Sequence, residues 1–138
     1  IRDPWHHEAI PLGTAVSLAS DVPMVYPFGH EADHTAAFVI EGAYDVGHPT
    51  LLLSDVLLGA EQAQAITRLA RRVGLDITLV LALLDLDRGA REELARAGFA
   101  VQAALTLSEM LPVLEQAGWL PPGMRAAVES WMAGHGRG

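Results

Sequence analysis

The sequence contains no lysine, because all nine of its basic residues are arginine. A lysine Schiff base and a lysine phosphate clamp are therefore excluded. Cysteine is also absent, which excludes disulfides and thiol catalysis and fits a reducing compartment such as the cytoplasm. No apolar run approaches the roughly 20 residues that a membrane span needs, so we expect no membrane association.

Positive charge is scarce as well, since the formal net charge is −8. Nucleic acids and other polyanions are bound through clustered cations, so we expect no nucleic-acid partner. At 138 residues the chain suits one domain with a real core, and we expect residues 1–138 to form a single domain. No signal-peptide pattern is present. The chain starts at Ile1, which leaves open whether the native protein extends upstream.

Hydrophobic periodicity predicts strands that alternate with helices. The strands are expected at residues 22–26, 38–41, 50–54, 76–84 and 99–105. The helices are expected at 11–19, 60–73 and 90–97, from 107 onward, and from 121 onward. We expect Pro112 to kink the helix that begins near 107 or to delay its start. In the last helix, Met124, Val128 and Trp131 are expected to face inward. This order predicts an α/β fold with a mostly parallel, Rossmann-like sheet flanked by helices on both faces. We expect the strand at 50–54 to be buried on both faces and the strand at 76–84 to be central.

Residues 50–62 have the architecture of a phosphate site. A strand at Leu51 to Leu53 leads into Ser54 and Asp55 and then through Gly59 into a helix. The free N–H groups and the dipole of a helix N-terminus favour an anion there. However, the segment holds one glycine, no cation, and an acid at Glu61. The architecture of a phosphate site is present, and most of its chemistry is missing.

Two other groups of residues carry possible chemistry. His30-Glu31-Ala-Asp-His34 matches H-E-x-x-H, which on a helix binds zinc with the glutamate as base. Here the motif follows Pro27 and Gly29, so a solvated loop is the competing interpretation. His6 and His7 are further candidate metal ligands if their segment lies beside the loop that holds His30 and His34. Asp85 and Asp87 follow a strand, and the commoner role of such residues is to cap the next helix.

The order of elements and several motifs resemble the orotate phosphoribosyltransferases. The matching segments are Pro-Leu-Gly-Thr-Ala-Val-Ser-Leu-Ala at 11–19, Val-Pro-Met-Val-Tyr-Pro at 22–27, Ile-Glu-Gly-Ala-Tyr at 40–44, the strand end at 51–55, Gly-Ala-Arg-Glu-Glu-Leu at 89–94 and Leu-Thr-Leu-Ser-Glu at 105–109. The resemblance implies a type I phosphoribosyltransferase fold. It begins partway into the family's pattern, and the N-terminal segment that hoods the orotate site has no counterpart.

The resemblance also implies a vestigial phosphoribosyl site. The family's two adjacent acids fall on Ser54 and Asp55, and its Thr/Gly loop falls on Leu58, Gly59, Ala60 and Glu61. The arginine that contacts orotate falls on Leu86, with Arg88 two positions away as a partial substitute. Of the cations in the mobile loop, only His34 keeps its place, with His30 nearby. Each of these changes weakens the binding of phosphoribosyl pyrophosphate.

Three hypotheses for the function follow. The first is a catalytically degenerate relative, a homodimer that acts as a binding or interaction module for a partner or a small phosphorylated or nucleotide-like ligand. The second is an active, magnesium-dependent orotate phosphoribosyltransferase that borrows a lysine from a different partner chain, since a chain without lysine cannot supply one to itself. The third is a metal-dependent hydrolase built on His30, Glu31 and His34.

Overall fold

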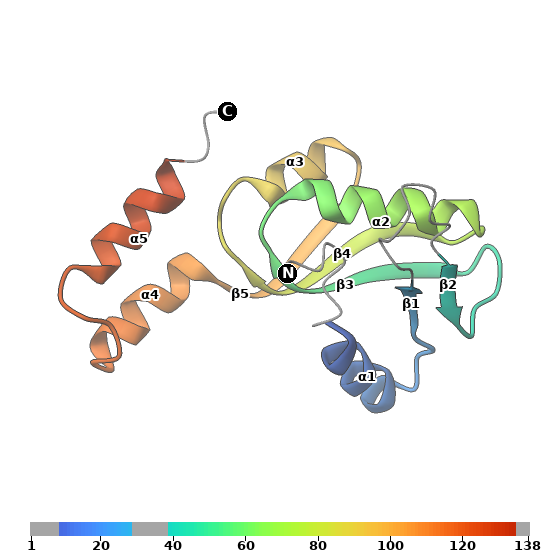
Figure 1. Ribbon diagram of the computed structural model, residues 1–138, viewed down its shortest axis with the longest axis horizontal. Coiled ribbons are helices and arrows are strands. Elements are labelled where there is room, and N and C mark those ends of the chain that lie inside the picture. Colours follow the sequence, from blue (N-terminus) through green and yellow to red (C-terminus); the bar gives the residue numbers. More distant parts are fainter. Residues whose placement is uncertain (1–8, 29–38, 135–138) are drawn as a thin grey trace.

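The computed structural model describes residues 9–28 and 39–134 of the chain, and strands and helices alternate between residues 49 and 116 (Figure 1). The helices are α1 (Ala9–Ser20), α2 (Ala60–Arg72), α3 (Ala90–Arg96), α4 (Leu107–Gln116) and α5 (Met124–Ala133). The strands are β1 (Val25–Phe28), β2 (Val39–Gly42), β3 (Pro49–Leu57), β4 (Asp76–Asp85) and β5 (Ala100–Thr106). None of the helices in this part of the chain is long and apolar enough to cross a membrane.

A parallel sheet of three strands forms the centre of the fold. Its order is β3-β4-β5, so β4 is the central strand. This confirms the expected α/β class and the central position of residues 76–84. The first two strands lie outside this sheet, because β1 pairs with β2 in a separate antiparallel ribbon.

Helices α2 and α3 cover one face of the sheet and α1 lies on the other (Figure 1). The core under α2 and α3 combines Ala60, Ala63 and Leu94 with Val80 and Ala82, and all five residues are buried. Small residues on both sides of this contact let the helix approach the sheet closely, and burying them stabilises the fold at about 25 cal/mol per Å² of apolar surface.

The second face of the sheet is covered only in part, which corrects the expectation that both faces of residues 50–54 are buried. Alternate side chains of a strand lie on opposite faces. Leu51 on β3 and Leu83 on β4 are each 44% exposed. Helix α1 contacts β3 but is too short to shield the whole surface.

One extra residue on β4 shifts the pattern of side chains along that strand. Thr50 of β3 pairs with Ile77, but Leu51 pairs with Leu79, so Thr78 has no partner on β3. As in a β-bulge, the strand changes which of its side chains face the helices. Accordingly Ile77 is buried before the irregularity, and Val80 and Ala82 are buried after it.

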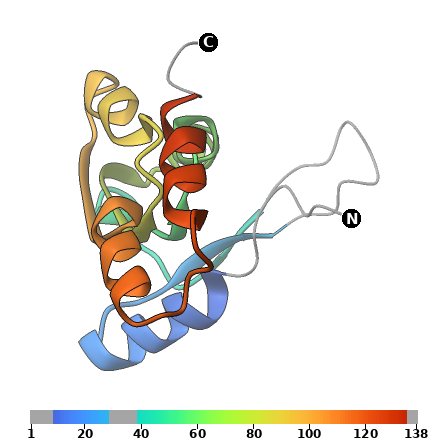
Figure 2. The ribbon, with the colours of Figure 1, turned by 90° about the vertical axis from the view of Figure 1, so that its left-hand side faces the viewer.

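The C-terminal helices form a hairpin beside the sheet (Figure 2). The capping box at the start of α4 is present as the sequence predicts: the Thr106 hydroxyl accepts from the Glu109 N–H at 3.2 Å, and the Glu109 carboxylate accepts from the Thr106 N–H at 3.1 Å. The helix starts directly at Leu107 and contains Pro112, so the expected delay does not occur. The stripe expected to face inward on α5 is only partly buried, because Val128 is half-buried and Met124 and Trp131 are 42% and 41% exposed.

Candidate functional site

The segment that resembles a phosphate site sits where β3 leads into α2. The strand does not end near Ser54 as expected, but continues to Leu57, because Val56 and Leu57 pair with Leu84 and Asp85 of β4. Ser54 and Asp55 are therefore strand residues, and both are half-buried. Their side chains are engaged locally: the Ser54 hydroxyl donates to the Val56 carbonyl at 3.1 Å, and Asp55 Oδ1 accepts from the Val56 N–H at 2.7 Å.

The N-terminus of α2 keeps the backbone geometry of an anion site. Gly59 is the N-cap residue, with extended φ and ψ, and no side chain caps the first turn. A Cβ built at Gly59 meets no atom within 4 Å, so the space above it is open. The first turn also holds the exposed Glu61, whose carboxylate already complements the helix dipole and would repel a phosphate.

A cavity of about 850 Å³ opens beside this turn and extends between β3, α1 and the β1–β2 ribbon. Its lining includes Ser54, Asp55 and Gly59 from the candidate site and a second carboxylate at Asp45. None of the described residues that line it is an arginine. A cavity with two carboxylates and no arginine in its described lining disfavours a ligand with several negative charges.

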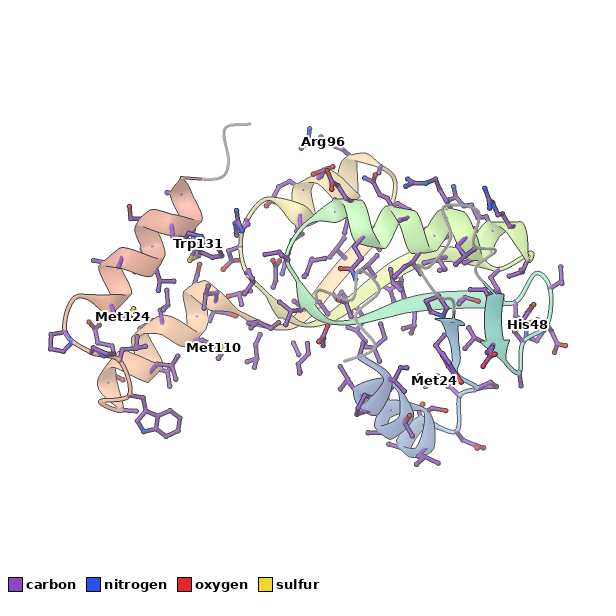
Figure 3. The ribbon with its side chains drawn as sticks, in the orientation of Figure 1. Met24, His48, Arg96, Met110, Met124 and Trp131 are labelled. Carbon is purple, nitrogen blue, oxygen red and sulfur yellow. The ribbon has the colours of Figure 1, made fainter. Side chains whose placement is uncertain are left out.

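Leu86 and Arg88, which the resemblance implies as remnants of a base site, follow the end of β4. The Leu86 N–H donates to the Leu57 carbonyl at 3.2 Å, which ties the end of β4 to the end of β3. Arg88 takes another direction: its guanidinium carbon lies 4.2 Å from the centroid of the Trp131 ring on α5. Figure 3 shows Trp131 on the side of α5 that faces the loop after β4, far from His48 at the start of β3. Neither Leu86 nor Arg88 lines the cavity.

Two acids at the end of β4 have structural roles. Asp85 is 1% exposed and accepts from Arg91 Nε at 3.1 Å and from the Asp87 N–H at 3.0 Å. Asp87 accepts from the Ser108 N–H at 3.0 Å, so it caps α4 rather than the next helix in the chain. The expectation that these acids cap the next helix is therefore wrong, because no described side chain caps α3 and Asp87 instead binds the first turn of α4.

The predicted metal ligands His30, Glu31 and His34 lie outside the described residues, as do His6 and His7. Within residues 9–28 and 39–134, no group of three or more histidine, aspartate or glutamate side chains is placed to hold a metal ion.

Sequence reasoning missed two contacts near the site. One is the stacking of Arg88 on Trp131. The other joins β1 to β2: the Tyr26 hydroxyl donates to Glu41 Oε2 at 3.2 Å. This hydrogen bond, helped by the charge of Glu41, raises the pKa of Tyr26 above its ordinary value. Tyr26 and Glu41 are 15 residues apart, and only the antiparallel register brings them together.

Comparison with known proteins relates the chain to one enzyme family. No protein-family model matches it. It is 34% identical over 103 residues to the orotate phosphoribosyltransferase of Methanoculleus marisnigri, covering 75% of this chain and 60% of that one. It is 29% identical over 110 residues to the uridine 5′-monophosphate synthase of Bos taurus, covering 80% of this chain and 23% of that one.

Solved structures give the same relationship. The UMP synthase of Leishmania donovani superposes with a TM-score of 0.81 at 26% identity, covering 92% of this chain and 27% of that one. The orotate phosphoribosyltransferase of Aeropyrum pernix superposes with a TM-score of 0.68 at 25% identity, covering 81% and 61%. The chain thus spans less than two thirds of the length of each of these proteins. These similarities give no support to the metal-dependent hydrolase.

Similarity in sequence and similarity in fold therefore lead to the same conclusion: the chain is a relative of the orotate phosphoribosyltransferases, with the type I phosphoribosyltransferase fold.

Proposed function

We propose that this chain is a catalytically degenerate relative of the orotate phosphoribosyltransferases that acts as a binding or interaction module. One observation carries the proposal. The open N-terminus of α2 at Gly59 borders a cavity whose described lining holds Asp45 and Asp55 and no arginine. A phosphoribosyl site with this lining keeps its shape and lacks the charges that hold its substrate.

The energies of the missing hydrogen bonds support a loss of phosphoribosyl transfer. A hydrogen bond to a charged group contributes about 1.5–3 kcal/mol. Leu58 and Ala60 cannot supply side-chain hydrogen bonds to a phosphate, Leu86 carries no guanidinium, and Glu61 adds repulsion. Losing three such bonds removes several kcal/mol, and each 1.4 kcal/mol weakens binding about tenfold.

Magnesium, which the resemblance implies for an active member, fits this site poorly. Magnesium at such sites is held by one or two carboxylates together with substrate phosphates. Ser54 replaces one of the two acids, and Oδ1 of the remaining Asp55 accepts from the Val56 N–H.

Self-association is part of the proposal. Apolar side chains are exposed on the C-terminal hairpin, where Val113 is 63% and Trp119 77% exposed. Covering them in a homodimer would bury apolar surface. Light scattering of the purified chain tests this, and a monomer at all concentrations would remove the homodimer from the proposal.

The decisive experiment supplies the purified chain with orotate, phosphoribosyl pyrophosphate and magnesium. We expect no orotidine 5′-monophosphate above background, and no heat of phosphoribosyl pyrophosphate binding by calorimetry. Glu61→Gln should strengthen the binding of inorganic phosphate at the start of α2, whereas the matched change Glu92→Gln on α3 should not. Turnover clearly above background would overturn the proposal, and tight binding of phosphoribosyl pyrophosphate would favour an active enzyme completed by a lysine-bearing partner.

A further inference from the structure

The end of α2 gathers positive charge on a chain that has little of it. Arg68, Arg71 and Arg72 are three of the nine basic residues, which face seventeen acids in the whole sequence. The buried side of the helix, which holds Ala63 and Ala70, packs on the sheet. All three arginines are exposed, so their guanidinium groups lie on the outer surface of α2.

No described carboxylate neutralises these three charges. Arg91 and Arg125 form ion pairs, whereas none of the α2 arginines does so with a described residue. Gln64 stands one turn before Arg68, where a glutamate would have paired with it. Arg68 and Arg72 are also one turn apart, and like charges at that spacing destabilise a helix. The dipole of α2 offsets part of this repulsion, and carboxylates from outside would offset more.

An exposed apolar side chain is held beside this cluster. Val46, in the turn between β2 and β3, is 75% exposed. A Cβ built at Gly74 would lie 2.6 Å from Val46 Cγ1, so the valine lies against Gly74, two residues after Arg72. The Gly47 N–H donates to the Gly74 carbonyl at 2.9 Å, which fixes the turn to the end of α2. Figure 1 shows this turn and the end of α2 at the same end of the molecule.

The arrangement of the guanidinium groups selects the chemistry of a partner. Each guanidinium presents a planar fork of N–H donors that matches a carboxylate. Side chains on the convex face of a helix diverge, so the three groups suit several separate anions better than one phosphate. Arg68 and Arg72 are about 6 Å apart along the helix axis, the same spacing as carboxylates one turn apart on a partner. A long nucleic acid would also meet the net charge of −8 on the rest of the chain, whereas a short segment would not.

We propose that the end of α2 binds an acidic segment of a partner protein through Arg68, Arg71, Arg72 and Val46. Carboxylates of the segment pair with the arginines, and an apolar side chain covers Val46, which gives the mixed composition of a protein interface. The inference rests on the proposed function, because it names the kind of partner that the binding module takes. Helix α2 has 13 residues, so about 18 Å separate this surface from the candidate site at Gly59.

A fluorescein-labelled, alanine-based peptide with glutamates one helical turn apart and a leucine beside the last glutamate tests the proposal by fluorescence anisotropy. We expect saturable binding that becomes about tenfold weaker when glutamines replace the glutamates, since exposed ion pairs are lost. Binding should also weaken with salt, because the Debye length falls from about 10 Å at 0.1 M to about 3 Å at 1 M. Absence of saturable binding, or equal binding of the glutamine peptide, would overturn the proposal.

Arg72→Gln should weaken peptide binding about threefold, the effect of one exposed ion pair. Arg96→Gln is the matched control, because it removes the same charge from the neighbouring helix α3. Arg96 is exposed and donates to the Glu92 carbonyl, and Figure 3 shows it on the side of α3 away from the sheet. This control should bind the peptide as the parent does. Equal weakening by both changes would show that only net charge matters and would overturn the site.

Val46→Thr tests the apolar part of the surface. Threonine keeps the shape of valine, so the turn should stay beside Gly74. The change should weaken binding of the leucine-bearing peptide and leave binding of a peptide with alanine in its place unchanged. The same response of both peptides would overturn the contact with Val46.

Other occupants give different results. Single-stranded DNA that binds as tightly as the peptide would show an unselective anion surface. A dimer that Arg72→Gln dissociates, without peptide binding by the parent, would show that a second copy covers α2. Either result overturns the acidic-segment site. Failure of this site leaves the proposed loss of catalysis intact, and measured phosphoribosyl transfer would overturn that loss without changing the peptide result.

Discussion

The guanidinium carbon of Arg88, in the loop after β4, lies 4.2 Å from the centre of the Trp131 ring on α5. This contact joins the C-terminal helix to the edge of the sheet where the candidate site lies. Helix α5 has no buried residue of its own, and an ion pair between Arg125 Nη1 and Glu115 Oε2 at 3.0 Å joins it to α4. Arg88, the cation that could have contacted a bound base, instead stacks on the ring of Trp131.

Trp131→Ala should therefore loosen α5. A cation–π contact contributes about 0.5–2 kcal/mol, so we expect a stability loss of about 1 kcal/mol in urea unfolding and faster amide exchange in α5. Trp119→Ala is the matched control, because Trp119 is 77% exposed. Equal effects of the two changes would show that the stacking does not hold the helix.

Asp85→Asn should destabilise the whole domain. The change removes a buried charge that receives the Arg91 Nε–H and the Asp87 N–H, and hydrogen bonds to charged groups contribute about 1.5–3 kcal/mol each. We expect the free energy of unfolding to fall by about 2 kcal/mol in urea titrations. Asp76→Asn, at an exposed position at the start of the same strand, should stay within about 0.5 kcal/mol of the parent. A loss no larger than that of Asp76→Asn would contradict this role.

Thr106→Ala should lower stability by about 1 kcal/mol, the usual cost of losing an N-cap side chain. Its hydroxyl accepts from the Glu109 N–H, and that bond has no replacement in alanine. Thr106→Ser keeps the hydroxyl and should recover most of the loss. Thermal unfolding followed by circular dichroism measures both, and an equally unstable serine variant would mean that packing of the methyl group matters instead.

Tyr26 should ionise above its ordinary range because its neutral hydroxyl donates to Glu41. Since the folded pKa is higher than the unfolded value of about 10, the stabilisation is complete below about pH 10. It disappears as the pH rises through the raised folded pKa. In a Tyr44→Phe background, phenolate absorbance reports Tyr26 alone, and Glu41→Gln should lower its pKa. An unchanged titration would show that Glu41 does not control the hydroxyl.

Sequence reasoning recovered the elements whose signals are local. The buried run at residues 76–84 predicts β4, the pattern at 60–73 predicts α2, and the Thr106–Glu109 spacing predicts a capping box; the structure contains all three. Each depends on neighbours within a few residues. The degenerate character of the site is a prediction that the fold leaves untested.

Features set by distant contacts were not recovered. The end of β3 at Leu57 depends on pairing with Leu84 and Asp85, almost thirty positions later. Asp87 caps α4 through Ser108, 21 residues away. The partial exposure of Met124 and Trp131 depends on where α5 docks, because helical spacing defines a stripe but not what covers it.

The single extra residue at Thr78 determines how closely α2 packs on the sheet. With Thr78 unpaired, Val80 and Ala82 meet Ala60 and Ala63, and the helix can settle close to the strands. If Thr78 were instead paired in a regular strand, the leucines at 79, 81 and 83 would lie in that narrow layer. Three bulky side chains would then wedge the helix away from the sheet and leave the start of α2 without the support that now fixes its position.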